Sequence, residues 1–207
     1  MGTPSPCTRV LSILVLACLL VSPSPPAATA EPEDPVRAFV EQVNSASNAF
    51  FASGSEADAR EKCRQLLAWA FDMQAMAEYA LAKAWDTTTG EERKAFLDAF
   101  EDEIITAYLR RMTNGAALTY VGAREPFKGD RYAASRLTQP GKADQTWIWR
   151  IRPAGDKWRI VDVMVDGHSA LFAERQEYAQ VLQDNHGDIN AVIALIRNRA
   201  ARGLQSK

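Results

Sequence analysis

The stretch "KWRIVDVMVDGHSALFAERQEY", Lys157 to Tyr178, spans the change from strand to helix on which the predicted fold depends. Its strand segment carries apolar side chains on both faces, and Asp162 stands among them. A strand that is apolar on both faces is covered on both sides rather than half exposed to water. Gly167 then allows a sharp turn, and Ser169 is suited to cap the helix that follows. The stretch therefore predicts an inner strand that leads directly into a helix.

The rest of the chain shows helical patterns first and strand patterns later. Apolar residues recur at helical spacing from residue 35, from residue 56, after Asp72 and after Thr89. Four short runs with a period of two follow, separated by turn residues: "AALTYVGA", "RYAASRLT", "QTWIWRIR" and "KWRIVDVMV". Two further helices end the chain. This order predicts an α+β fold, in which helices pack on one face of a curved, mostly antiparallel four-stranded sheet. We expect a cone-shaped, NTF2-like arrangement that encloses an apolar pocket.

One helix carries an unusually aromatic stripe, and strand residues of similar character face it. The stripe repeats every four residues at Phe96, Phe100, Ile104, Tyr108 and Met112. Such a stripe must lie against something apolar, either the sheet or a ligand. By themselves these positions favour a packed core over a ligand cavity, because aromatic stripes most often belong to cores.

The N-terminus has the features of a cleaved export signal. A start that carries Arg9 leads into the apolar run "VLSILVLACLLV" and then into small residues that end at Ala30. We expect cleavage after Ala30, so that residues 1–30 are removed and residues 31–207 form a single domain. Lipidation of Cys18 is the rival interpretation, which we disfavour because apolar residues continue beyond it.

Composition excludes several function classes. Lysines and arginines number 24 against 26 acidic residues, for a net charge of −2, and both signs are interspersed along the chain. A nucleic-acid partner is therefore not expected. The two histidines, His168 and His186, lack the spacing of a zinc site, and the sequence has no phosphate loop or dinucleotide motif. We predict no metal and no cofactor.

A catalytic role for His168 and its neighbour Ser169 is not supported by their spacing. A nucleophile elbow requires a glycine two residues after the serine, and Leu171 stands there instead. We therefore interpret Ser169 as a helix cap and expect no chemistry from His168.

Asp162 has two possible roles. It could act as a general base of raised pKa beside Tyr108 or Tyr120, in an isomerase or hydrolase of cone-shaped α+β fold. It could instead form an ion pair with Arg136 or Arg150 on neighbouring strands. We favour the ion pair, because a buried carboxylate needs a partner.

Three parts of the chain, within residues 35–200, carry motifs that occur together in one known family. The motif residues are Phe71-Asp72, Met76-Ala77, Leu81, Trp85, Thr89, Arg93, Phe96, Phe100 and Tyr108, then Trp158, Arg159, Ile160, Asp162, Val163, Gly167, Ser169, Arg175 and Tyr178, and last the tail "VLQDNHGDINAVIALIRNR". In this order they resemble the MlaC-like, toluene-tolerance family of periplasmic lipid-binding proteins. His168 departs from the family pattern, which has an aliphatic residue there.

The resemblance implies a monomeric periplasmic carrier and not an enzyme. Such a carrier moves a phospholipid between an outer-membrane lipoprotein complex and an inner-membrane ABC transporter complex. The related HpnM branch implies a hopanoid, a triterpenoid lipid, as the cargo instead. The resemblance favours a ligand cavity over a packed core.

From the faces of the strands and of the aromatic helix we predict nine residues that line this cavity. They are Phe96, Phe100, Tyr108, Tyr120, Leu137, Trp147, Trp149, Val163 and Val165. Two hypotheses from other classes remain: a small-molecule isomerase or hydrolase that uses Asp162, and a structural adaptor with a solid core.

Overall fold

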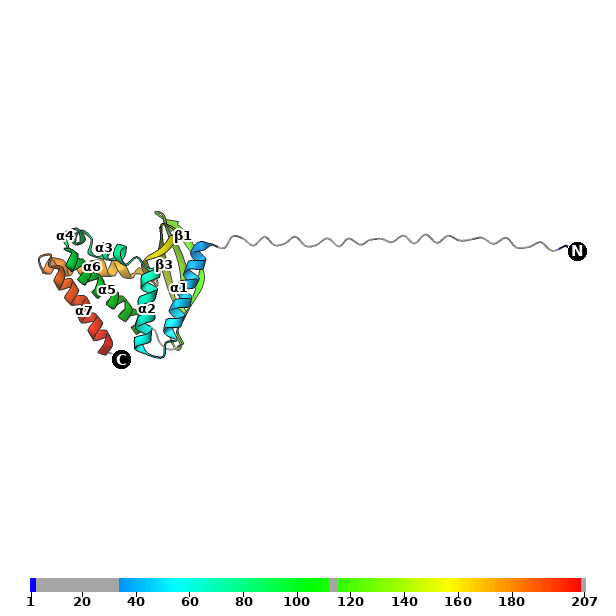
Figure 1. Cartoon of the computed structure of the whole chain (residues 1–207), viewed down its shortest axis with the longest axis horizontal. Helices are drawn as coiled ribbons and strands as arrows, with labels where there is room; N and C mark the ends of the chain where they lie inside the picture. Colours follow the sequence, from blue (N-terminus) through cyan, green and yellow to red (C-terminus); the bar gives the residue numbers. More distant parts are fainter. Residues whose placement is uncertain (3–33, 112–114, 206–207) are drawn as a thin grey trace. The chain divides into compact units, whose positions relative to one another are not determined.

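The computed structural model describes residues 1–2, 34–111 and 115–205. Apart from its first two residues, the predicted export signal therefore lies outside the described residues, as does Met112 of the aromatic stripe. The elements (Figure 1) are α1 (Pro35–Phe51), α2 (Glu56–Ala70), α3 (Met73–Leu81), α4 (Lys83–Thr87), α5 (Gly90–Arg111), β1 (Ala117–Phe127), β2 (Asp130–Thr138), β3 (Gln145–Ala154), β4 (Lys157–Val165), β5 (His168–Ser169), α6 (Ala170–Asp184) and α7 (Ile189–Gln205). None of the described helices is both long enough and apolar enough to cross a membrane.

The strands form one antiparallel meander in the order β1-β2-β3-β4-β5, which confirms the predicted α+β class. The predicted number of four strands is wrong, because a fifth follows β4. Asp166 (φ 49°) and Gly167 (φ 85°) turn the chain back, so that His168 pairs with Val165 and Ser169 with Met164. Positive φ at both turn positions is typical of a tight hairpin. A strand of two residues has no alternation that a sequence pattern could reveal.

Side-chain caps fix where the helices begin. Ser169 Oγ accepts a hydrogen bond from the amide of Phe172 at 2.9 Å, which confirms the predicted cap of α6. At the start of α5 the amide of Thr89 donates to Glu92 Oε2 at 2.8 Å, while the amide of Glu92 donates to Thr89 Oγ1 at 3.3 Å. This reciprocal pair is a capping box.

The aromatic stripe of α5 lies against the sheet and against α6. The ring of Tyr108 meets Trp147 of β3 edge-on, with ring centroids 5.5 Å apart. Phe96 and Phe100 stack at 5.5 Å, and Phe96 also meets Tyr178 of α6 at 5.9 Å. Edge-on and offset pairs of this kind add stability beyond the burial of their apolar area. The stripe therefore joins α5 to both β3 and α6.

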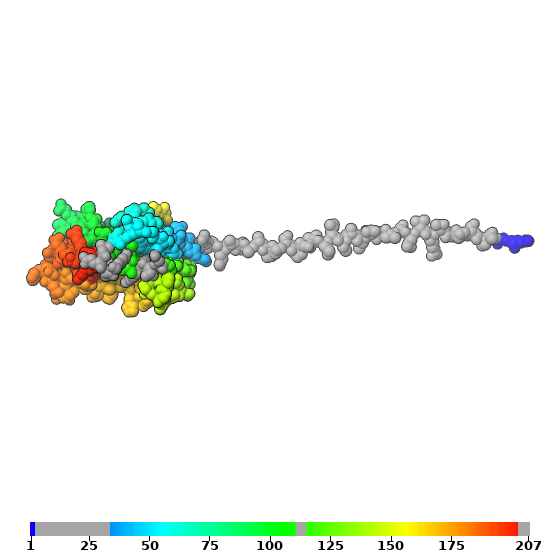
Figure 2. Space-filling model, turned by 90° about the horizontal axis from the view of Figure 1, so that it is seen from below, coloured from blue at the N-terminus to red at the C-terminus, as the bar shows by residue number. Residues whose placement is uncertain are grey.

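The helices are divided between the sheet and one another. α1 packs on β1 and β2, while α2, α3 and α6 contact β4. α7 packs on α5 and α6 and forms part of the outer surface, where it is red in Figure 2. α2 and α3 also pack on α5, so both helices contact α5 as well as β4.

A buried polar chain crosses the core between the sheet and α1. Trp149 Nε1 donates to Ser135 Oγ at 2.9 Å, and Ser135 Oγ donates to Asn44 Oδ1 at 2.9 Å. Trp149 and Ser135 are fully buried and Asn44 is 4% exposed. A buried polar group that loses its partner costs about 1–3 kcal/mol. The chain therefore fixes the position of α1 over β2 and β3.

We predict that Ser135→Ala lowers the free energy of unfolding by about 2 kcal/mol, because it leaves the indole N–H of Trp149 without its acceptor. Chemical denaturation monitored by circular dichroism measures this change. Ser45→Ala is the matched control, because Ser45 lies on the exposed side of α1 and should change stability by less than about 0.5 kcal/mol. Equal stability of the two variants would contradict the role given to this polar chain.

Candidate functional site

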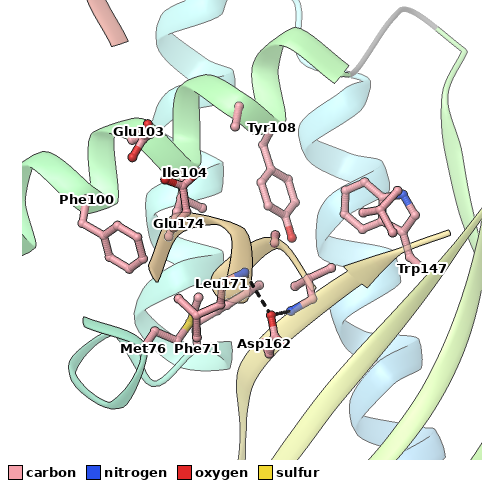
Figure 3. Close-up of a pocket in the computed structure, with 14 residues that line it drawn as sticks. Phe71, Met76, Phe100, Glu103, Ile104, Tyr108, Trp147, Asp162, Leu171 and Glu174 are labelled. Carbon is pink, nitrogen blue, oxygen red and sulfur yellow. Dashed lines mark hydrogen bonds between the residues drawn. The ribbon is translucent and has the colours of Figure 1, made fainter. Parts of the chain in front are cut away.

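An apolar cavity of about 120 Å³ lies between α5 and the ends of β3 and β4. Figure 3 shows the side chains of Phe100 and Tyr108 pointing away from α5, toward the side of the cavity that Leu171 and Asp162 line. Most of the lining is aromatic or aliphatic, with three acidic residues among it. The lining residues are Phe71, Met76, Phe100, Glu103, Ile104, Ala107, Tyr108, Trp147, Asp162, Val163, Val165, Ala170, Leu171 and Glu174.

The exposure of the lining residues distinguishes the inner end of the cavity from its opening. Phe100 (2% exposed) and Trp147 (1% exposed) are fully covered and lie at its depth. Ile104 and Ala107 on α5, together with Val165 at the end of β4, are only half-buried. The opening therefore lies between α5, the end of β4 and the start of α6.

Five of the nine residues predicted to line a cavity do line this one. They are Phe100, Tyr108, Trp147, Val163 and Val165. They come from three separate elements, α5, β3 and β4, so the structure brings together residues up to 65 positions apart in the sequence. Their contact with a lipid stays a prediction.

The other four predicted residues lie elsewhere. Phe96 is fully buried between α5 and α6, one turn before the cavity, and Leu137 and Trp149 are fully buried within the sheet layer. Tyr120 on β1 lies beneath the guanidinium of Arg37, 5.6 Å from the ring centroid. Side-chain direction was predicted from the sequence, but the extent of the open space was not.

Several residues that line the cavity were not among the nine predicted from the sequence. Ile104 belongs to the aromatic stripe and was recognisable as inward-facing, and Met76 follows helical spacing in α3. Glu103 and Glu174 gave no such signal, because a charged residue on a helix is usually exposed. Only the packing of α5, α6 and α7 brings these two carboxylates to the cavity wall.

Asp162 of β4 is held by three donors, two of which lie at the start of α6. Its carboxylate accepts hydrogen bonds from Ser169 Oγ at 2.6 Å, from the amide of Val163 at 2.8 Å and from the amide of Leu171 at 3.3 Å. The predicted ion pair is wrong, because Arg150 pairs with Asp130 at 2.6 Å and Arg136 lies 3.9 Å from Asp144. A carboxylate is favourable at this position because the first amides of a helix carry partial positive charge.

Burial raises the pKa of Asp162 above its ordinary value, although its three donors act in the opposite direction. Tyr108 lines the same cavity, as a catalytic role for Asp162 would require, whereas Tyr120 does not. The three donors nevertheless give Asp162 a structural role that needs no chemistry: it attaches the first turn of α6 to β4.

A second buried carboxylate, Glu103, lies at the other side of the cavity. Glu103 accepts a hydrogen bond from the hydroxyl of Tyr178 at 2.9 Å and one from Arg199 at 3.0 Å. Arg199 also pairs with Glu174 at 2.9 Å and with Glu177. Burial and the nearby charge of Glu174 raise the pKa of Glu103. One guanidinium from α7 is thus shared by three carboxylates from α5 and α6.

His168 lies on the surface, outside the lining of the cavity. Its ring Nδ1 is 3.1 Å from the carbonyl oxygen of Asp166, within the turn that forms β5. Among the residues that the structure describes, no group of three or more histidine, cysteine, aspartate or glutamate side chains is arranged to hold a metal ion.

We predict that Asp162→Ala lowers the free energy of unfolding by about 3 kcal/mol, because it leaves one hydroxyl and two amides without their buried, charged acceptor. Thermal or urea unfolding measures the loss. Asp86→Ala is the control, because Asp86 is exposed on α4 and its removal should change stability by less than about 0.5 kcal/mol. If Asp162→Ala were as stable as the control, the attachment of α6 would have to rest on other contacts.

The fold and sequence of this chain both match known proteins. The sequence model of the family described as "MlaC protein" matches residues 38–198. A solved structure, that of a phospholipid-binding protein from Ralstonia solanacearum in complex with a phospholipid, is similar with a TM-score of 0.68. The two are 16% identical, and the match covers 81% of this chain and 98% of that chain. At this identity the likeness shows a shared fold.

No curated protein matches the chain in sequence. The family match, in contrast, spans well over half of the 207 residues. It includes the helices and strands that line the cavity and confirms the resemblance seen in the motifs. The chain belongs to the MlaC family.

Proposed function

We propose that this protein is a periplasmic carrier that shields the acyl chains of a phospholipid in the cavity beneath α5. The observation that carries the proposal is the apolar cavity itself, which five inward-facing residues of α5, β3 and β4 line as the strand and helix patterns predict. Membership of the MlaC family, and a phospholipid-bound protein of the same fold, support it. Both point to binding and transport rather than to catalysis.

The cavity volume indicates that its walls move when a lipid binds. A volume of about 120 Å³ is smaller than the ~300–1,000 Å³ of pockets that enclose drug-sized ligands. Acyl chains therefore require α5 to move away from the sheet and from α6, whose first turn stays attached to β4. Ile104, Ala107 and Val165 are only half-buried at the opening, so fewer packing contacts oppose movement there than at Trp147.

The energetics of a buried lipid require a partner for its release. At about 0.8 kcal/mol per methylene, some 30 methylenes correspond to roughly 24 kcal/mol, above the ceiling of about 18–21 kcal/mol for non-covalent affinity. Escape of such a lipid into water would be far too slow for transport. We therefore propose that the lipid passes directly to and from membrane-bound complexes, an outer-membrane lipoprotein complex and an inner-membrane ABC transporter complex.

The N-terminal sequence and the family both support a periplasmic location. The run of apolar residues that ends in small residues before Glu31 is typical of an export signal. We propose that cleavage after Ala30 releases the folded domain into the periplasm, between the two membranes that the carrier would serve. Cys63, the one cysteine after residue 30, is free and fully buried, and without a second cysteine it forms no internal disulfide once residues 1–30 are removed.

We predict that Ala107→Trp reduces phospholipid uptake at least tenfold, because the indole would fill the opening of the cavity. The measurement is transfer of a fluorescent phospholipid from vesicles to delipidated protein, followed by gel filtration. Ala194→Trp is the matched control, because Ala194 is exposed on α7, away from the cavity lining, and it should take up lipid like the wild type. Thermal unfolding of both variants shows that they are folded. Uptake by Ala107→Trp equal to that of the control would place the lipid elsewhere.

A further inference from the structure

All charged side chains that line the cavity are acidic. Glu103 comes from α5, Asp162 from β4 and Glu174 from α6, and among the described lining residues none is a lysine or an arginine. Figure 3 shows Glu103 and Glu174 on the α5 side of the cavity and Asp162 at the opposite end. The polar part of a ligand in this cavity therefore meets carboxylates.

Glu174 is the acidic residue nearest to solvent. Its side chain is 30% exposed, whereas that of Glu103 is 11% exposed. The other half-buried residues at the opening, Ile104, Ala107 and Val165, are apolar. A headgroup that remains at the opening while its chains are buried would thus meet Glu174 as its first charged contact.

The negative charge of this wall is only partly balanced. Arg199 is shared among Glu103, Glu174 and Glu177, so one positive charge faces three carboxylates. The donors to Asp162 are a hydroxyl and two amides, which carry no net charge. The lining therefore favours an additional positive charge.

Two other described cations on α5 and α6, Arg110 and Arg175, belong to other contacts. Arg175 of α6 donates to the carbonyl of Tyr79 at 3.1 Å and lies over its ring. Arg110 of α5 lines a separate depression, which it shares with Lys142, Asp144 and Asp166. That depression contains as many acidic as basic side chains, so it does not reverse the sign of the charge at the opening.

This charge distribution distinguishes between lipid headgroups. A phosphodiester with no other charge brings a negative group toward carboxylates in a partly buried site, where like charges repel more strongly than in water. A primary ammonium brings a positive charge and three hydrogen-bond donors, which carboxylate oxygens accept well.

We infer that the opening selects zwitterionic lipids with a primary ammonium group over lipids with a purely anionic headgroup, and that Glu174 is the residue that recognises the ammonium. The inference rests on the proposed lipid-carrier function and adds a headgroup class to it.

The test is a competition within one vesicle. Delipidated full-length mature protein is incubated with vesicles of equal parts phosphatidylethanolamine and phosphatidylglycerol with the same acyl chains, re-isolated and extracted. Mass spectrometry then gives the ratio of the two lipids bound. Because both lipids are in the same vesicle, a general attraction or repulsion between protein and membrane affects them equally. We expect at least a fivefold excess of phosphatidylethanolamine for the wild type.

Two variants assign the preference to Glu174. Glu174→Gln should reduce the excess to less than twofold, and Glu174→Lys should reverse it. Glu91→Gln is the control for net charge, because Glu91 is exposed at the start of α5, and it should keep the wild-type ratio.

Each outcome has a distinct meaning. Equal uptake of the two lipids by the wild type, or an excess of phosphatidylglycerol, overturns the inference and leaves the carrier function intact. A preference that Glu174→Gln retains as fully as Glu91→Gln overturns the assignment to Glu174. Uptake of neither lipid contradicts the carrier function and, with it, the inference.

Discussion

The cavity depends on the carboxylate of Asp162 at the N-terminus of α6. Ser169 both caps α6 and donates to Asp162, while the amide of Leu171 donates to the same carboxylate. These bonds fix the first turn of α6 against β4 and thereby place Leu171 and Glu174 in the cavity wall. The two-residue strand β5 is the connection that makes this possible, because it turns the chain back beside the end of β4. Without this attachment, the cavity would lose one of its walls.

The carboxylates of the cavity reflect a compromise between stability and ligand recognition. Burial raises the pKa of both Asp162 and Glu103, so keeping them charged opposes folding at neutral pH. A packed core would replace them with apolar residues. Their neighbours partly compensate for the cost: helix amides and a serine hydroxyl at Asp162, and Tyr178 with Arg199 at Glu103. A cavity with a mostly apolar lining and one partly exposed carboxylate, Glu174, at its opening would suit an amphiphile whose chains are buried and whose headgroup stays near water.

The sequence was sufficient for the fold class and for the direction of many side chains, but not for the extent of the cavity. Helical and strand periodicity shows which face of α5 and β3 is inward, so Phe100, Tyr108 and Trp147 were predictable. Periodicity does not show where along α5 the packing opens, and Phe96 therefore lies in solid core instead. The partner of Asp162 was mispredicted for a related reason. An arginine on a neighbouring strand fits the sheet pattern, whereas Ser169 and Leu171 come close to Asp162 only when the turn after β4 brings the chain back.

We propose above all that this protein holds a membrane lipid beneath α5. Native mass spectrometry of protein purified without detergent, combined with solvent extraction of the same sample, tests it most directly. We predict a complex one phospholipid heavier than the chain, and recovery of a two-chain phospholipid on extraction. A bound triterpenoid would keep the carrier function and change the cargo. A chain of unmodified mass, with no lipid in the extract and none taken up from vesicles, would show that the protein does not carry a lipid.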